Sequence, residues 1–328
     1  MSKVVVVTGA SAGVGRAAAK AFAGRGDRVA LIARGSDSLE GASRDVERAG
    51  GEVLVVPADV ADHEQVEAAA GAVQSELGPI DVWVNNAMTT VFAPFAEVEP
   101  EEFARATAVT YLGVVWGTMA ALRRMKPQGR GVVVQVGSAL AYRGIPLQAP
   151  YCGAKHAIKG FTESVRSELL HEGSDVRLTM VQLPALNTPQ FDIGRTKMDR
   201  KPQPVPPIYQ PEIAASAIVW ASEHRRREIQ VGGPTVKTIL GNKLFPAAAD
   251  RYLARTGVSA QLTDERLDGG RDGNLFAPVP GDHGTRGRFD GAWERSLQLV
   301  LAKHRGAVAG AMGVAAMGTA AAIIRRHL

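Results

Sequence analysis

A phenol and an ammonium group stand four residues apart in the stretch Y-C-G-A-K, whose ends are Tyr151 and Lys155. If this stretch is helical, both side chains lie on one face of the helix. A tyrosine can give or take a proton during a reaction, and a nearby ammonium group lowers its pKa by favouring the phenolate. The same residue types also occur on ordinary half-exposed helices, so the pair predicts proton transfer only if other chemistry lies beside it.

A glycine-rich stretch near the N-terminus, T-G-A-S-A-G-V-G at residues 8–15, supplies such chemistry. It follows the β-branched run Val4–Val7 and precedes a stretch with helical periodicity. Glycines let the backbone approach a pyrophosphate, and the N-terminus of the following helix faces its charge. The sequence therefore predicts a dinucleotide site. The spacing G-x-x-x-G-x-G resembles that of the short-chain dehydrogenase/reductase family and differs from the commoner G-x-G-x-x-G.

Ser138 lies at the predicted end of a strand and precedes Tyr151. Ligands bind at the carboxyl ends of strands in open α/β sheets, so the serine, the pair and the glycines are expected to share one crevice. Together they resemble the catalytic Ser-Tyr-Lys of short-chain dehydrogenases. The resemblance implies that Tyr151 is the general acid/base, that Lys155 holds the nicotinamide ribose, and that Ser138 binds the substrate oxygen. Thr110 stands where the family often has an asparagine that helps to hold a water, and it is the fourth catalytic candidate.

Arg34 follows the second predicted strand, where an acidic residue would bind the ribose 2′-hydroxyl of NAD(H). A guanidinium group suits a 2′-phosphate, so we predict NADP(H) rather than NAD(H); the alternative is an arginine solvated on a loop. Met88 and Ala185 stand where the family usually has glycine. The resemblance places the following residues around the cofactor: Gly9, Ser11, Ala12, Gly13, Val14, Gly15, Arg34, Asp59, Val60, Asn86, Ala87, Tyr151, Lys155, Pro184, Leu186 and Thr188.

Short β-branched runs alternate with helical patterns over most of the chain. The runs are nearly continuous in apolar residues, which is typical of parallel strands buried on both faces. We therefore predict an α/β fold of the Rossmann type, a doubly wound parallel sheet with helices on both faces. The predicted strands are Val4–Val7, Val29–Ile32, Val53–Val56, Ile80–Val84, Val132–Val136, Val176–Val181 and Ile229–Val231. The predicted helices are Gly13–Ala23, Ser38–Ala49, His63–Glu76, Glu101–Met125, Ala154–His171 and Glu212–Glu223.

The composition of the 328 residues limits the class of protein further. The single cysteine, Cys152, excludes an internal disulfide and a cysteine-rich zinc site, and we predict no metal site. The apolar run Val4–Val7 is too short for a signal peptide, so a cytoplasmic location is expected. The net charge is +5, but the basic residues form no long stripe and no nucleic-acid module is apparent. Nucleic acid is therefore not an expected partner.

The chain is expected to have three parts: an NADP(H)-binding domain at 1–245, a mostly irregular extension at 246–300, and an apolar small-residue helix at 301–328. Residues 306–324 carry no charge, and a helix of that length would span about 28 Å, close to the membrane core of roughly 30 Å. Alanine and glycine, however, insert weakly. A membrane anchor, a helix lying on a membrane surface and a helix packed on a partner subunit all stay open.

The function that these patterns favour is the interconversion of an alcohol and a ketone or aldehyde with NADP(H). The substrate is expected to be a small molecule and apolar, because the proline-rich stretch after Pro184 offers no clear charged anchor. A homo-oligomer is expected, since helices of this family commonly pair subunits. Met88 and Thr110 motivate an alternative, an NADP(H)-binding sensor or scaffold with little or no turnover. An anchoring or assembly role for residues 246–328 would be compatible with either.

Overall fold

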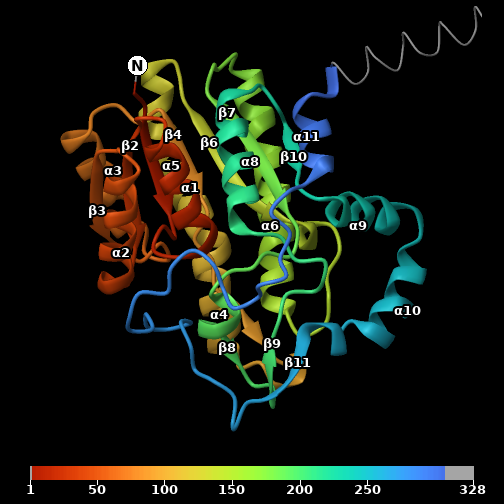
Figure 1. The fold of residues 1–328 in the computed structure, drawn as a ribbon. Helices are drawn as coiled ribbons and strands as arrows, with labels where there is room; N and C mark the ends of the chain where they lie inside the picture. Colours follow the sequence, from red (N-terminus) through yellow and green to blue (C-terminus); the bar gives the residue numbers. More distant parts are fainter. Residues whose placement is uncertain (1, 307–328) are drawn as a thin grey trace, which may run out of the picture.

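A seven-stranded sheet forms the centre of the computed structural model, which describes residues 2–306 (Figure 1). The strand order is β10-β7-β6-β4-β1-β2-β3, and all neighbouring strands are parallel. The chain therefore winds outward in both directions from the centre, and the predicted doubly wound sheet is confirmed. The strands are β1 (Val4–Thr8), β2 (Arg28–Ala33), β3 (Val53–Pro57), β4 (Val82–Asn85), β6 (Val132–Ser138), β7 (Arg177–Leu183) and β10 (Glu228–Gln230).

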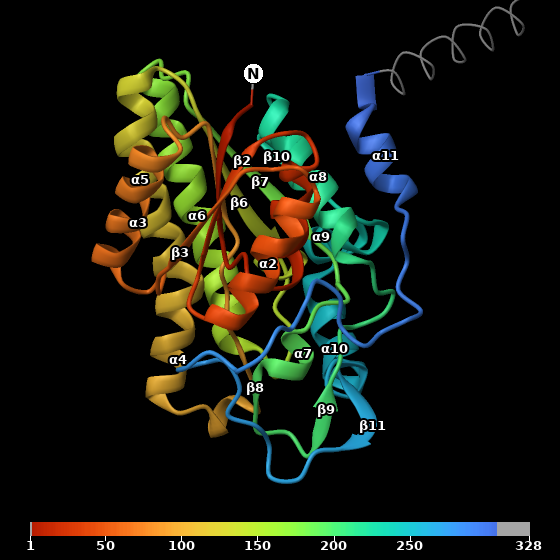
Figure 2. The same cartoon turned by 60° about the vertical axis from the view of Figure 1, so that its left-hand side comes forward.

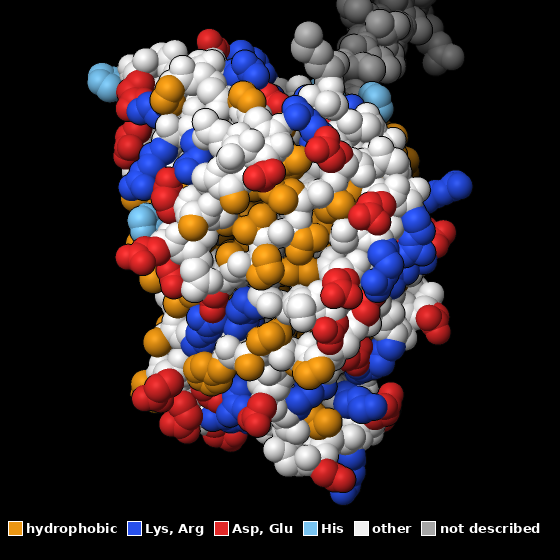
Figure 3. All heavy atoms as spheres, turned by 90° about the vertical axis from the view of Figure 1, so that its left-hand side faces the viewer, with side chains coloured by type: hydrophobic (Ala, Val, Ile, Leu, Met, Phe, Trp, Pro, Cys, Tyr) orange, Lys and Arg blue, Asp and Glu red, His pale blue; other side chains and the backbone are white. Residues whose placement is uncertain are grey.

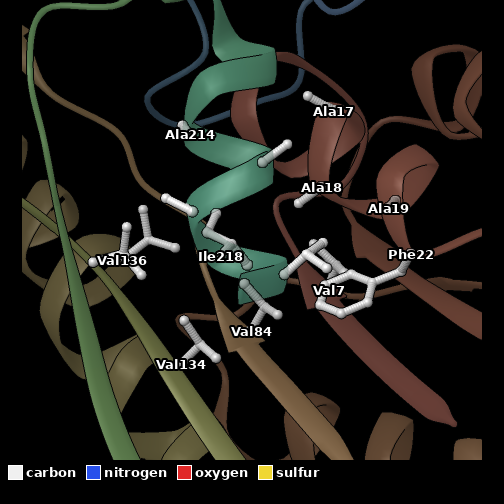
Figure 4. Close-up of a cluster of buried hydrophobic side chains, with 14 of the residues drawn as sticks. Val7, Ala17, Ala18, Ala19, Phe22, Val84, Val134, Val136, Ala214 and Ile218 are labelled. Carbon is white, nitrogen blue, oxygen red and sulfur yellow. The ribbon is translucent and has the colours of Figure 1, made fainter. Parts of the chain in front are cut away.

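Helices cover both faces of this sheet because strand side chains alternate between them. Val5 and Val7 enter the core beneath α1, α2 and α8, whereas Val4 and Val6 enter the core beneath α3, α5 and α6. Figure 4 shows the first core, where α1 and α8 pack on the valines of the central strands. These helices are α1 (Gly13–Ala23), α2 (Ser36–Arg48), α3 (His63–Glu76), α5 (Gly113–Gln128), α6 (Ala149–His171) and α8 (Pro211–Glu223).

Two of the predicted helices differ from the structure in a way that matters for the site. The helix expected at Glu101–Met125 is confirmed in extent but is not α-helical throughout: α4 (Pro100–Thr107) continues through a π-helical turn, Ala108–Leu112, into α5. Such a turn bonds residue i to residue i+5 within an otherwise helical backbone, and no residue type marks it in the sequence. The helix expected from Ala154 begins earlier, at Ala149. Pro150 in its first turn costs no hydrogen bond there.

Beyond the sheet, the chain returns to the carboxyl ends of the strands. Helices α9 (Gly233–Leu244) and α10 (Pro246–Thr256) lead to β11 (Leu262–Arg266), which pairs antiparallel with β9 (Arg200–Pro202). The chain between β11 and α11 (Leu297–Lys303) has no helix or strand and crosses below the sheet in Figures 1 and 2, where it is blue. This part of the extension therefore packs against the sheet domain near the crevice.

The two edge strands of the sheet are β10 and β3, and β3 lies at the left of Figure 1. Its valines and leucine are only partly buried, unlike those of the central strands. Figure 3 shows hydrophobic side chains gathered on this face of the molecule.

Within residues 2–306, no helix is both long enough and apolar enough to cross a membrane. The uncharged run 306–324 lies outside the described residues except for Gly306. Its three interpretations stay predictions.

Replacing Gly15 by alanine tests how closely α1 must approach the end of β1. A Cβ at Gly15 would lie 2.1 Å from the carbonyl oxygen of Gly9. Because both groups belong to the main chain, this clash is relieved only if the backbone of α1 or of the loop moves. We expect Gly15→Ala to lower the free energy of unfolding by about 1–3 kcal/mol and to impair dinucleotide binding. Urea unfolding measures the first effect.

Gly160→Ala is the matched control, because it is also a helical glycine but has no atom within 4 Å of the added Cβ. It should leave the free energy of unfolding unchanged or raise it by about 0.5–1 kcal/mol. Equal responses of the two variants would show that the close approach is unimportant.

Candidate active site

The predicted catalytic triad is brought together at the carboxyl end of β6. Ser138 is the last residue of β6, and the first two turns of α6 carry Tyr151 and Lys155. The Lys155 Nζ lies 5.5 Å from the centroid of the Tyr151 ring and donates a hydrogen bond of 2.6 Å to the carbonyl of Val136. All three side chains line one cavity. The pair quoted first is therefore helical and shares its crevice with the serine.

Burial shifts the pKa values of both members of the pair toward their neutral forms. It raises the pKa of the Tyr151 phenol above its ordinary value, while the nearby Ser138 hydroxyl acts in the opposite direction. It lowers the pKa of the Lys155 ammonium to about 8. At neutral pH the phenol thus holds its proton, which is the form that a general acid needs.

Thr110 lies apart from this group. Its hydroxyl donates to the carbonyl of Thr89 at 2.8 Å and accepts from the N–H of Thr89 at 3.0 Å, and the residue is fully buried. It does not belong to the cavity lining that contains Tyr151. Its observed contacts hold the chain that follows β4, and its expected part in a water relay stays a prediction.

The cavity has a volume of about 950 Å³ and follows the carboxyl ends of the strands. Gly15 is missing from its lining because it lies beneath the loop, against Gly9. The other predicted cofactor residues all line it: Gly9, Ser11, Ala12, Gly13, Val14, Arg34, Asp59, Val60, Asn86, Ala87, Tyr151, Lys155, Pro184, Leu186 and Thr188.

The glycine loop is fixed from behind by the chain that follows β4. Gly9 has φ +64°, and a Cβ there would lie 2.7 Å from the Cα of Ala87. The Asn86 amide donates to the carbonyls of Thr8 and Gly9, at 3.0 and 3.2 Å. The Thr8 hydroxyl accepts from the N–H groups of Asn86 and Ala87, at 3.0 and 3.1 Å. Asn86 therefore holds the loop as well as lining the cavity.

The N-terminus of α1 opens from this loop with no side-chain cap and no acidic residue in its first turn. Because the first N–H groups of a helix lack intrahelical partners, this end favours an anion. A pyrophosphate fits these residues.

Arg34 and Asp59, the two charged residues predicted for the adenosine end of the cofactor, already have partners. Asp59 forms an ion pair with Arg105. The Arg34 guanidinium donates to the carbonyls of residues 274–276, in the extension. Burial lowers its pKa, but an arginine stays charged at neutral pH.

The extension supplies residues of the cavity that the sequence did not predict. Asn274, Pro278, Val279 and His283 line it beside Arg34 and Ser38. Their surroundings are rich in glycine, proline and aspartate, which predicts a loop, but local composition does not tell which crevice a loop covers.

The other end of the cavity lies over the catalytic group. Residues 203–207 line it, as expected of the proline-rich stretch, and so do parts of α9 and α10 that the sequence did not predict there. Val205 and Leu253 contribute apolar side chains to this part of the lining, and Arg143 and Lys237 contribute cationic ones. Arg143 is paired with Asp250.

A parallel sheet with a glycine loop and a Ser-Tyr-Lys group at one crevice defines a dinucleotide-binding oxidoreductase. A model of the family described as short chain dehydrogenase matches residues 3–198. The protein belongs to the short-chain dehydrogenase/reductase family.

Three proteins that this chain resembles are named as oxidoreductases or dehydrogenases. The uncharacterized oxidoreductase YxnA of Bacillus subtilis is 32% identical over 296 residues, which cover 90% of this chain and 83% of the relative. The 2-(R)-hydroxypropyl-CoM dehydrogenase of Xanthobacter autotrophicus is 36% identical over 67% of this chain and 88% of its own. An alcohol dehydrogenase of Thermococcus sibiricus, solved with 5-hydroxy-NADP, is 28% identical with a TM-score of 0.60, over 70% of this chain and 96% of its own.

Thr110→Val tests the role that the structure shows for this hydroxyl. Valine keeps the shape but leaves both backbone groups of Thr89 without their buried partner, so we expect the free energy of unfolding to fall by about 1–3 kcal/mol. Thr110→Ser keeps the hydroxyl and should cost less. Equal stability of the valine and serine variants in urea unfolding would contradict this role.

Proposed function

We propose that the protein is an NADP(H)-dependent oxidoreductase that interconverts an alcohol and a ketone or aldehyde. The observation that carries the proposal is the meeting of Ser138, Tyr151 and Lys155 with the glycine loop at one cavity. These residues come from three separate parts of the chain. Structural roles in β6, α6 and the loop after β1 would not require their side chains to line the same cavity.

The chain's own residues supply the proton and the orientation. Tyr151, protonated at neutral pH, gives its proton to the carbonyl oxygen during reduction and takes it back during oxidation. Ser138 donates to the same oxygen and stabilises the charge that develops there. Lys155 holds the nicotinamide ribose and keeps a positive charge 5.5 Å from the centroid of the Tyr151 ring. When bound, the cofactor supplies or accepts the hydride.

NADP(H) suits the positive charge of the protein groups at the end of the cavity where the adenosine would bind. Gly9 and Gly13 present no side chains to the cavity, and the N-terminus of α1, which has no side-chain cap and no acidic residue in its first turn, suits the pyrophosphate. Arg34 lines the cavity with a charged guanidinium, which favours a 2′-phosphate over a hydroxyl. No acidic residue follows β2 directly to bind a ribose diol.

The substrate end favours a small carbonyl compound or alcohol that is largely apolar. Its walls come from the proline-rich residues 203–207 and from apolar side chains of α9 and α10, including Leu253. Cytoplasmic location and self-association stay predictions from the sequence.

A panel of ketones and aldehydes, with NADPH consumption followed by absorbance, tests the proposed reaction. Tyr151→Phe removes the transferable proton and should lower kcat at least about 100-fold while cofactor binding is kept. Tyr142→Phe is the matched control, because the Tyr142 hydroxyl bonds to Glu228 and does not line the cavity. Cofactor binding without turnover of any compound would favour the sensor or scaffold instead.

Arg34→Ala tests the cofactor preference. Losing a charge-assisted contact should weaken NADPH binding about ten- to a hundredfold relative to NADH. Arg105→Ala is the control, because Arg105 also donates to the carbonyl of Leu275 but has no proposed phosphate contact. It should change the dissociation constants of both cofactors alike. Equal affinity of the wild type for NADPH and NADH would contradict the preference.

A further inference from the structure

One segment of the extension, residues 274–284, follows the outer edge of the cofactor crevice from end to end of its adenosine half. It begins beside Arg34, whose guanidinium donates hydrogen bonds to the first carbonyls of the segment. It continues along the start of α2, where Gly281 donates to the Asp37 carboxylate at 2.9 Å and accepts from the Ser38 hydroxyl at 2.8 Å. It reaches the glycine loop at Gly284, whose carbonyl accepts from the N–H of Gly13 at 3.1 Å. We call this stretch the clasp segment.

The clasp segment forms a wall of the cavity rather than lying outside it. Pro278, Val279 and His283 line the cavity together with Arg34 and with Ser11 of the glycine loop. A dinucleotide whose pyrophosphate lies at the start of α1 and whose ribose lies at the end of β2 is therefore enclosed between the sheet and this segment.

The strongest attachment of the clasp segment is an ion pair. Asp282 binds Arg16, the residue that follows the last glycine of the loop, through both guanidinium Nη atoms. Arg16 is only 5% exposed, and its remaining partner is Asp45 at 2.9 Å. Removing Asp282 leaves half of a buried guanidinium without its counter-ion. The other attachments, including those of Arg34 and Gly281, are hydrogen bonds to the backbone of the segment.

The surface under Asp282 is shaped for this pair. Gly41 of α2 has no side chain, and a Cβ there would lie 2.1 Å from the Asp282 Oδ2. Glycine otherwise weakens a helix interior, so its place in α2 is explained by the space that the carboxylate takes.

We propose that the clasp segment is part of the cofactor site and controls how fast the cofactor leaves, with the Asp282–Arg16 pair as its fastening. This rests on the proposed function in that a dinucleotide must bind the crevice. It does not depend on which dinucleotide binds, because the adenosine and pyrophosphate are common to NADP(H) and NAD(H). When the Asp282–Arg16 ion pair breaks, the clasp segment is free to move away and the adenosine half of the crevice is exposed to solvent.

Stopped-flow displacement of bound NADPH, and separately of NADH, from the full chain tests the clasp. Asp282→Asn keeps the shape but removes the charge, and Gly41→Ala leaves the segment unchanged but fills the space beneath it. Both should raise the release rate of each cofactor about tenfold or more. Asp290→Asn is the matched control, because Asp290 is exposed in the same extension and has no ion pair within the described residues. It should release cofactor as the wild type does.

Hydrogen exchange gives a second readout that needs no variant. Amides of residues 274–284 should exchange more slowly when NADPH or NADH is added to the wild-type chain. Release rates unchanged in both variants, with no such protection, would overturn the clasp while leaving the proposed function intact. Tighter binding in both variants would overturn it as well, because the segment would then compete with the cofactor. Failure of both dinucleotides to bind would overturn the proposed function and the clasp together.

Discussion

The site depends on a contact between backbones at the start of α1. Gly15 lies against the Gly9 carbonyl, and Gly9 lies against Ala87, at distances that leave no room for a side chain. These contacts set the helix directly on the end of β1. Asn86 and the Thr8 hydroxyl then hold the loop in this position. The conformation of the glycine loop is therefore fixed by contacts within the protein.

The group Ser138, Tyr151 and Lys155 is positioned by another strand of the same sheet, β6. β6 ends at Ser138 and supplies the Val136 carbonyl that holds the Lys155 ammonium, so one strand positions two of the three residues. The helix that carries Tyr151 starts just before it, and burial there keeps the phenol protonated. The order of strands thus places Tyr151 and the glycine loop along one crevice.

The sequence predicted the sheet, its helices, and the glycine loop and Ser-Tyr-Lys group that line part of the cavity, because buried parallel strands and glycine turns leave local patterns. It did not predict the π-helical turn around Thr110 or the place of the clasp segment. The turn keeps a helical backbone and requires no particular residue type, so the sequence does not mark it. Asp282 meets Arg16 across 266 residues of sequence, and such a pairing leaves no periodic signal. The partners of Arg34 were missed for the same reason.

Transfer of hydride to a carbonyl carbon is measured most directly with NADPH that carries deuterium at both C4 positions of the nicotinamide. The wild-type protein is incubated with ketones and aldehydes, and the alcohols formed are analysed by mass spectrometry. The proposed reaction predicts one deuterium on the carbinol carbon of the product. Alcohol without deuterium at that carbon, or no alcohol from any compound of the panel, would contradict it.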